Sequence, residues 1–274
     1  MDWFADEEFW RATYPYMFPP ERMEAAAGQV EQVLALAGVT GGAVLDLCCG
    51  PGRHSVEFAR RGFAVTGVDR SPFLSGRARE RALEAGVAVE WVLEDMRRFR
   101  RPGAYDLACS MFTSFGYFES EADDLQVLRN LCESLKPGGV LVMEMIGLEC
   151  LARMWEDSWC EDYPDGMTVI KRACLRDNWT RVENDWILLK DGRSRTFHFE
   201  HSLYSARDHR NSLWRSGFAD VRIFGDLAGS EYGISARRLV SVARKAPAPV
   251  SSPTSLLPSA VSEGGTHGMQ AGST

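Results

Sequence analysis

Positive charge, long apolar runs and paired cysteines are all scarce in this sequence of 274 residues. Because 31 lysines and arginines face 38 acidic residues, the formal net charge is -7, which argues against the clustered basic surface that binds nucleic acid. The first ten residues lack the basic region of a signal peptide, and no segment reaches the roughly 18 apolar residues of a membrane-spanning helix. We therefore expect a cytoplasmic protein that binds neither nucleic acid nor membranes.

The cysteines form no disulfide or metal-binding pattern. The seven cysteines include no Cys-x-x-Cys pair, their number is odd, and a chain of this length needs no disulfide bonds to stabilise its core. Cys48 and Cys49 are adjacent, but no other cysteine or histidine pair nearby has the spacing of metal ligands. We expect reduced cysteines, with Cys49 buried, Cys48 in a loop, and no bound metal.

Short apolar runs alternate with amphipathic helical patterns through most of the chain. Apolar residues at helical spacing run from Glu21 to Gly38 and lead into the strand-like AVLDL. Further helices are predicted at 54–61, 72–85, 121–135 and 205–216, between the predicted strands AVTGVD, VEWVLED, YDLACSMF, GGVLVMEMI, ADVRIF and RLVSVARK. This alternation predicts an α/β fold with a doubly wound, mostly parallel, Rossmann-like sheet of seven strands.

The pattern changes after Gly147. The segments MTVIKRACL, WTRVENDWILLK and RSRTFHFEHSLY read as extended, and Asp191-Gly192 suits a hairpin turn, so we expect an antiparallel β lid inserted into the core. The last residues are rich in Pro, Ser and Gly, which predicts a disordered tail. The expected divisions are an amino-terminal helical and aromatic segment (1–40), the α/β core (41–147), the inserted lid (148–204), the completion of the core (205–245) and the tail (246–274).

The segment LDLCCGPGRHS, residues 45–55, contains a glycine-rich turn with unusual residues. It lacks the Gly-Lys-Ser/Thr ending of a P-loop, and Cys48 stands where a dinucleotide-binding turn has its first glycine, so neither a nucleoside triphosphate nor a pyrophosphate is favoured. Asp69, after the next strand, suits ribose hydroxyls, or it caps the helix that begins at Ser71-Pro72. Asp46 would repel phosphate but suits an ammonium or a sulfonium. The turn therefore predicts a positively charged nucleoside ligand.

The motifs LDLCCGPGRHS, GVDRSPFL, LEDMR and LKPGG occur in this order and resemble those of class I S-adenosylmethionine-dependent methyltransferases. FTSFGYF, followed by EADDLQVL, resembles a bacterial small-molecule group of that superfamily. Cys48 departs from the usual glycine. The resemblance implies S-adenosylmethionine as cofactor and S-adenosylhomocysteine as product. It also implies a set of cofactor-binding residues on the first turn, after the second, third and fourth strands, and on the aromatic amino-terminal segment: Asp46, Cys48, Gly50, Gly52, Asp69, Arg70, Phe73, Leu74, Asp95, Met96, Ser110, Met111, Tyr14 and Tyr16.

Specific roles follow from the same resemblance. Asp46 is expected near the methionine ammonium, and Gly50 and Gly52 would let the backbone approach the methionine portion. Asp69 would take the ribose hydroxyls. Adenine would meet a side chain from Phe73 or Leu74, the Asp95 carboxylate and the Met96 N–H, whereas Ser110 and Met111 would line the methionine side. Tyr14 or Tyr16 would lie near the sulfonium, where cation–π attraction is favourable, unless this segment packs against the lid or a second subunit.

The motif FHFEH offers candidates for acid–base catalysis. In a strand, His198 and Glu200 share one face and His201 lies on the other, so we consider all three as catalytic residues, with an exposed polar lid face as the alternative. Tryptophans and arginines of the insertion could bind an acidic or hydroxylated substrate: Trp155, Trp159, Trp179, Trp186, Arg172, Arg176, Arg181 and Arg195.

The sequence lacks an Asn/Asp-Pro-Pro-aromatic motif after its fourth predicted strand and has SMFTSF there instead. That absence disfavours methylation of amino groups on nucleic-acid bases. We expect methyl transfer to N or O of a small metabolite, such as a natural-product intermediate. The alternatives are C-methylation, a cyclase or decarboxylase that only binds the cofactor, a nicotinamide oxidoreductase, or a non-catalytic sensor. A homodimer is left open.

Overall fold

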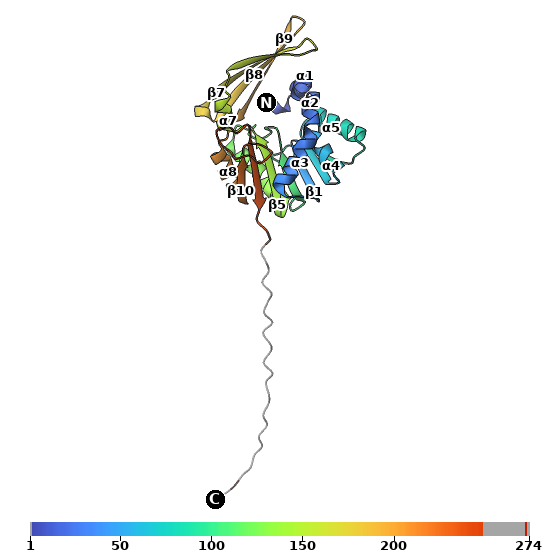
Figure 1. Cartoon of the computed structure of the whole chain (residues 1–274), viewed down its shortest axis with the longest axis vertical. Coiled ribbons are helices and arrows are strands. Elements are labelled where there is room, and N and C mark those ends of the chain that lie inside the picture. Colours follow the sequence, from blue (N-terminus) through green and yellow to red (C-terminus); the bar gives the residue numbers. More distant parts are fainter. Residues whose placement is uncertain (1, 249–271, 273–274) are drawn as a thin grey trace.

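The structure is a computed structural model that describes residues 2–248 and 272. It contains a seven-stranded sheet in the order β10-β11-β5-β4-β1-β2-β3 and a separate four-stranded sheet in the order β6-β7-β8-β9 (Figure 1). The predicted α/β class, the seven-stranded, mostly parallel sheet and the inserted antiparallel sheet are thus confirmed. Apart from residues 246–248 and 272, the predicted disordered tail lies outside the described residues.

The large sheet positions a crevice at its centre. Its strands are β1 (Ala43–Leu47), β2 (Ala64–Asp69), β3 (Glu90–Leu93), β4 (Tyr105–Ser110), β5 (Leu135–Met145), β10 (Phe218–Phe224) and β11 (Leu239–Lys245). β11 runs antiparallel to both of its neighbours, and the pairings among β1 to β5 are parallel. The strand order reverses between β1 and β4, and ligands of such sheets bind beyond the carboxyl ends of the strands at that point.

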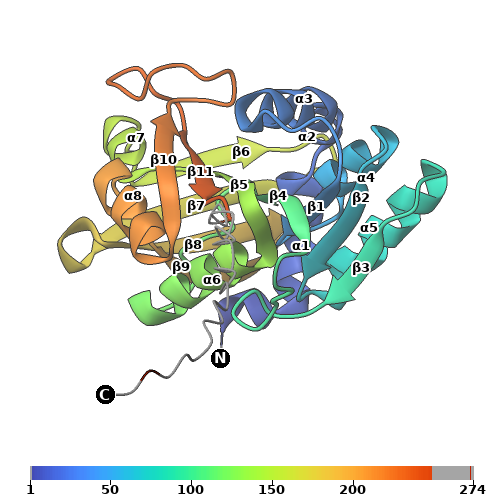
Figure 2. The same ribbon diagram turned by 90° about the horizontal axis from the view of Figure 1, so that it is seen from below.

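Helices cover both faces of this sheet because successive side chains of each strand point to opposite faces. The helices lie on both sides of the large sheet (Figure 2). On β1, Val44 packs in one core cluster with residues of α3 and α4, whereas Leu45 packs in another with residues of α6 and α8. The helices are α3 (Ala26–Ala37), α4 (Arg53–Arg60), α5 (Pro72–Glu84), α6 (Glu121–Ser134) and α8 (Ala206–Arg215). None of the described helices is long and apolar enough to cross a membrane.

Serine side chains fix where three of these helices begin. Ser71 accepts from the Leu74 N–H at 3.2 Å, Ser120 from the Ala122 N–H at 3.2 Å, and Ser205 from the Asp208 N–H at 3.1 Å. Each bond satisfies one of the amide groups that has no partner within the first turn of a helix. The helix after β2 therefore starts next to Asp69, at the carboxyl rim of the sheet.

The second sheet lies over the carboxyl rim of the first, and α7 (Leu148–Arg153) leads into it (Figure 1). Its antiparallel strands are β6 (Ser158–Asp162), β7 (Thr168–Arg176), β8 (Arg181–Lys190) and β9 (Arg193–Ser202). The predicted turn joins β8 to β9, with Asp191 and Gly192 at φ 50° and 71°, as a tight hairpin requires. Val169, Leu188 and Phe197 are buried and mark the inner face of this lid sheet.

The amino-terminal segment, residues 2–24, fills the space between the two sheets. It comprises a short 3₁₀ turn (Trp3–Ala5), α1 (Glu7–Met17) and α2 (Pro20–Glu24). The ring of Phe9 lies 5.5 Å from that of Phe197 and 5.5 Å from that of Phe199, and Trp3 Nε1 donates to the Glu200 carbonyl at 2.8 Å. Aromatic packing therefore joins this segment to the lid sheet.

Candidate functional site

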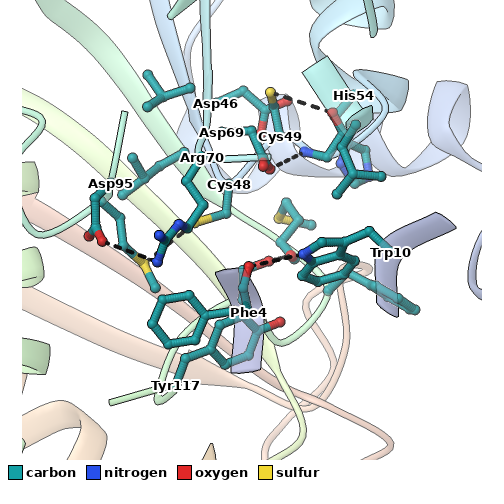
Figure 3. A pocket seen from close by; sticks show the side chains of 18 of the residues that line it. Phe4, Trp10, Asp46, Cys48, Cys49, His54, Asp69, Arg70, Asp95 and Tyr117 are labelled. Carbon is teal, nitrogen blue, oxygen red and sulfur yellow. Dashed lines mark hydrogen bonds and ion pairs between the residues drawn. The ribbon is translucent and has the colours of Figure 1, made fainter. Parts of the chain in front are cut away.

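A cavity lies at the carboxyl ends of β1, β2 and β4, under the amino-terminal segment (Figure 3). Residues from five parts of the chain line it. They are Phe4, Trp10, Met17, Phe18, Asp46, Leu47, Cys48, Cys49, Gly50, Arg53, His54, Val68, Asp69, Arg70, Leu74, Glu94, Asp95, Met96, Met111, Phe112, Ser114, Tyr117 and Phe118. One wall is polar and acidic, and the opposite wall, from the amino-terminal segment and Tyr117, is aromatic (Figure 3).

The turn after β1 winds tightly because three of its residues adopt left-handed backbone conformations. Cys48, Gly50 and Gly52 have φ values of 59°, 54° and 73°. A Cβ on Gly52 would lie 2.7 Å from the Trp91 ring, so this glycine is required both by its conformation and by the close packing around it. Cys48, in the place of the expected first glycine, carries a conformation that costs a non-glycine residue about 1 kcal/mol or more.

Asp46 is a buried carboxylate at the end of β1, with 1% of its surface exposed. Ser55 Oγ donates to its Oδ2 at 2.6 Å. Burial raises the pKa of Asp46 to about 6, although the Ser55 hydrogen bond and the charge of Arg53 act in the opposite direction. A carboxylate held in this way gains from a cationic ligand, because the ligand's charge offsets the cost of burying the ionised form.

Asp69 connects the first two turns of the rim. Its Oδ2 accepts from the Gly50 N–H at 2.8 Å, and its Oδ1 from the Ser71 N–H at 2.9 Å. Burial raises the pKa of Asp69 despite these two hydrogen bonds. The oxygens keep free lone pairs, so the carboxylate can still accept from the hydroxyls of a ligand.

Asp95 lies at the other end of the cavity and is held by arginines. Arg97 Nη2 donates to Asp95 Oδ2 at 2.7 Å and Arg97 Nε to Oδ1 at 3.1 Å, while Arg70 Nη1 lies 3.7 Å from Oδ2. Burial acts to raise the pKa of Asp95, but the hydrogen bonds and charges of these arginines outweigh it and lower the pKa. Asp95 therefore stays ionised and fixed in orientation.

Arg53 and His54 also line the cavity, although the sequence analysis assigned them no site role. Gln29 Oε1 accepts from Arg53 Nη1 at 2.5 Å and lies 2.9 Å from His54 Nε2. Burial, with the nearby Arg53 charge, lowers the pKa of His54 well below its usual value, so this histidine is neutral. The sequence did contain a signal for this role. Arg53 and His54 directly follow Gly52 at the start of α4, and the amino-terminal end of a helix after such a turn often faces the ligand.

Nine of the fourteen predicted cofactor residues line this cavity, and five do not. Asp46, Cys48, Gly50, Asp69, Arg70, Leu74, Asp95, Met96 and Met111 are on its wall, and Gly52 shapes the turn behind it. Phe73, Ser110, Tyr14 and Tyr16 lie elsewhere. Tyr14 packs on Phe73 at 5.5 Å, and the Tyr16 hydroxyl donates to Asp165 at 3.2 Å. The amino-terminal segment instead contributes Phe4, Trp10, Met17 and Phe18 to the wall.

The three catalytic candidates of β9 lie outside the cavity wall. His198 is exposed on the outer face of the lid sheet, with Nδ1 2.9 Å from Asp185, and Glu200 pairs with Arg181 at 3.1 Å. His201 points to the inner face, where burial and the Arg181 charge lower its pKa to about 4. The structure brings none of these side chains to the lining of the cavity.

The tryptophans and arginines of the insertion are likewise spread over the lid sheet. Trp186 packs on Phe199 at 5.4 Å, whereas Trp179 is 46% exposed. Arg176 pairs with Glu183 and Arg195 with Glu8, so these arginines are already engaged in the structure.

A strained turn follows β4 beside the cavity. Phe112 and Thr113 both have left-handed backbones, with φ of 64° and 58°, which is rare for a β-branched residue. Glu144 of β5 holds the turn, because its Oε2 accepts from the Phe112 N–H at 2.7 Å and its carbonyl from the Thr113 N–H at 3.0 Å. The Phe112 ring is part of the cavity wall. Backbone strain of this kind persists only where the surrounding structure holds it, and it is common at functional sites.

Residues 44–139 match a family described as "Methyltransferase domain". A putative methyltransferase YqeM of Bacillus subtilis is 24% identical over 210 residues, which are 74% of this chain and 84% of that protein. A ubiquinone biosynthesis O-methyltransferase of Xanthomonas campestris is 30% identical over 140 residues, which are 46% of this chain and 57% of the relative.

Two solved structures share the fold over most of the chain. The CcbJ methyltransferase of Streptomyces caelestis has a TM-score of 0.70 at 21% identity and covers 81% of this chain and 90% of its own. CalS10, an amino pentose methyltransferase of Micromonospora echinaspora solved with S-adenosylmethionine bound, has a TM-score of 0.63 at 21% identity and covers 86% and 96%. At these identities the likeness shows the fold.

Proposed function

We propose that this chain is a class I S-adenosylmethionine-dependent methyltransferase that methylates a nitrogen or oxygen atom of a small metabolite. The methyltransferase domain matched by residues 44–139 supports this proposal. The observation that carries the proposal is a buried carboxylate, Asp46, at the end of β1 together with a second carboxylate, Asp69, which accepts from the Gly50 N–H across the turn. The arrangement fits a ligand that combines a positive charge with ribose hydroxyls.

The lining residues suit the parts of S-adenosylmethionine. Asp46 would accept from the ammonium, and Arg53, whose side chain is on the wall behind the turn, would pair with the carboxylate of the same methionine portion. Asp69 would accept from the ribose hydroxyls, and Asp95, Met96 and Leu74 would surround the adenine. Each pairing matches charge or hydrogen-bonding capacity, which a buried polar group needs.

When bound, the cofactor supplies a methyl carbon that is activated by the sulfonium for displacement by a lone pair. The chain's contribution is to align the acceptor with that carbon and to exclude water. The rings of Phe4, Trp10 and Tyr117 close the cavity on the side facing the polar turn (Figure 3). Aromatic faces also favour a neighbouring cation.

Nitrogen is the preferred acceptor atom in this proposal. A neutral amine needs no base, whereas a hydroxyl gains from one. The histidine on the wall, His54, contacts Gln29 and has a lowered pKa, and His198, His201 and Glu200 lie off the wall. Under this proposal the wall carboxylates Asp46, Asp69 and Asp95 serve the cofactor, which favours an acceptor that needs no base. The amino pentose methyltransferase with this fold is consistent with an amine.

The test is calorimetric titration of the full chain with S-adenosylmethionine, S-adenosylhomocysteine and NADH. We expect binding of the first two only. Asp69→Asn should weaken cofactor binding at least tenfold, because a ribose hydroxyl would lose its charged acceptor. Asp220→Asn, an exposed change on β10, is the matched control and should bind normally. Binding of NADH alone, or an unchanged Asp69→Asn variant, would contradict the site.

Turnover is tested separately with amines and hydroxylated metabolites. Formation of S-adenosylhomocysteine in step with the methylated product is the expected result. Product without S-adenosylhomocysteine would point to a cyclase or decarboxylase that only binds the cofactor.

A further inference from the structure

Three arginines gather around the strained turn beside the cavity. The guanidinium of Arg22 lies 4.3 Å from the centre of the Phe112 ring, and that of Arg53 lies 5.5 Å from it. Arg238 donates to Thr113 Oγ1 at 3.0 Å. We call Arg22, Arg53 and Arg238 the arginine cluster. It is assembled from α2, α4 and the segment before β11, so only the fold brings these residues together.

The cluster has little negative charge to balance it. Glu144 pairs with Arg238, and its side chain is 11% exposed. Glu161, on the lid sheet above, is already paired with Lys171 at 2.7 Å and accepts from the Tyr163 hydroxyl at 2.6 Å. Asp46 also attracts Arg53, so Glu144 and Asp46 offset part of the cluster's charge. Arg22 donates to the Met17 carbonyl and forms no ion pair with the described residues.

The cations also repel one another. Burial lowers the pKa of Arg22, and the charge of Arg238 lowers it further, while Tyr163, Glu161 and Glu144 act against this. A cluster of like charges costs stability unless a function or a ligand compensates for it. An oxyanion bound between the guanidiniums would offset the repulsion.

The location links the cluster to the reaction. The Phe112 ring lines the cavity on one side, and Arg22 lies over that ring. A group held by Arg22 and Arg238 would therefore sit about one ring away from the cavity, within the length of a small metabolite. Arg53 is itself on the cavity wall and, under the proposed function, serves the methionine carboxylate.

We propose that the acceptor carries an oxyanion, a phosphate or a carboxylate, which Arg22 and Arg238 bind while the acceptor atom reaches into the cavity. This rests on the proposed function, and it adds the chemical class of the substrate. The forked guanidinium groups match both oxyanions, because each can accept two parallel hydrogen bonds. The strained turn at Phe112 and Thr113 then serves to hold the ring between the two binding regions.

The experiment uses the full chain saturated with S-adenosylhomocysteine and titrates it with pyrophosphate and, separately, with malonate. Sodium chloride keeps the ionic strength constant, because exposed charges would otherwise respond to salt alone. The variants are Arg22→Gln and Arg238→Gln, with Arg238→Lys to retain the ion pair with Glu144. The matched control is Arg60→Gln, which removes one exposed arginine from α4.

The expected result is saturable binding of at least one probe. It should weaken at least tenfold in Arg22→Gln and Arg238→Gln, less in Arg238→Lys, and remain unchanged in Arg60→Gln, while affinity for S-adenosylhomocysteine stays within twofold throughout. Preference for pyrophosphate would indicate a phosphorylated acceptor, and preference for malonate a carboxylated one.

Three results would overturn the proposal. The first is that neither probe binds saturably, and the second is that the two glutamine variants bind the probes as the wild type does. The third is that these variants lose S-adenosylhomocysteine instead, because the cluster would then serve the cofactor's own carboxylate. If the wild-type chain fails to bind S-adenosylhomocysteine at all, the proposed function itself is wrong and this inference falls with it.

Discussion

At the scale of single residues, the site uses buried carboxylates that cost stability. Asp46 is the clearest case, because its environment is arranged around a charge that has no cation in direct contact within the described residues. Ser55 and Arg53 reduce the cost of ionising it but do not remove it. A ligand that supplies a positive charge would make the ionised form favourable. The ionised carboxylate of Asp46 therefore lowers the stability of the ligand-free chain while it raises the affinity for a cationic ligand.

This opposition predicts a pH-dependent effect of Asp46→Asn. Since the folded chain raises the pKa of Asp46 to about 6, the folded state holds a proton that the unfolded state loses near pH 4. The free energy of unfolding of the wild type thus falls as pH rises from about 4 to about 6 and stays lower above that range. The cofactor-free variant should be more stable than the wild type at pH 8, by about 2 kcal/mol, and the difference should vanish at pH 4.

Urea unfolding of both proteins at pH 4, 5, 6 and 8 measures this difference. The same variant should bind S-adenosylmethionine at least tenfold more weakly at pH 8. A stability difference of equal size at every pH would show that Asp46 does not titrate as described.

At the scale of elements, the turn between β1 and α4 depends on packing from a neighbouring strand. Trp91 of β3 lies over both Gly52 and Gly67, where an added Cβ would come within 2.7 Å and 2.5 Å of its ring. The turn therefore depends on a large side chain about 40 residues away in the sequence, and no local motif reveals that contact.

The glycines of this region allow a matched comparison. Gly52→Ala should lower the free energy of unfolding by about 2–4 kcal/mol, because the new Cβ meets Trp91 and Ala78 and the left-handed backbone is strained. Gly76→Ala, inside α5 with nothing within 4 Å of its Cβ, should instead raise it by about 0.5–1 kcal/mol. Thermal and urea unfolding of both variants provide the measurement. Equal effects of the two changes would contradict the packing argument.

Several elements could be predicted from the sequence, and others could not. Helix starts at Ser71 and Ser205 and the Asp191-Gly192 hairpin were predicted because each has a local chemical cause. β6 was missed, because SWCED is short, acidic and free of β-branched residues. The sequence also predicted that Asp46, Asp69 and Asp95 lie at one rim of the sheet, because the carboxyl ends of parallel strands meet there.

To predict the remaining cavity residues, one must know which face of a helix or strand points toward the cavity. The periodicity of the sequence does not give this information. In α1 the pattern is aromatic nearly all around, so the sequence could not show that Trp10 faces the cavity while Tyr14 and Tyr16 face α5 and the lid. In β9 the alternation correctly separated His198 from His201 but did not say which of them was inside. Arg22 and Arg238 are more than 200 positions apart, so only the folded chain brings them to the same turn.

At the scale of the whole molecule, the amino-terminal segment covers one side of the cavity. Asp2 pairs with Arg97 at 3.1 Å and Arg70 at 3.7 Å, and the Glu7 carboxylate accepts from the Phe73 N–H at 3.0 Å. Because Phe4 and Trp10 line the cavity, we expect S-adenosylmethionine to displace this segment when it enters. These ion pairs are partly exposed, so salt should weaken them.

We therefore predict that salt speeds cofactor entry. The association rate of the uncharged-sulfur product S-adenosylhomocysteine, followed by tryptophan fluorescence, should rise severalfold between about 0.05 and about 0.5 M NaCl. Asp2→Asn should raise the low-salt rate and reduce this dependence. A rate that is independent of salt in both proteins would mean that the segment does not limit entry.

The reversed direction of β11 has a practical consequence. Since β11 runs antiparallel to β5, its last residue, Lys245, lies at the end of the strands away from the cavity. The amino-terminal segment lies at the cavity instead (Figure 1). An immobilising tag fused on the carboxyl side would leave the entrance free to open, and the same tag on the amino side would load the segment that has to move. Paired biosensor measurements with the two attachments would show whether loading this segment slows cofactor entry.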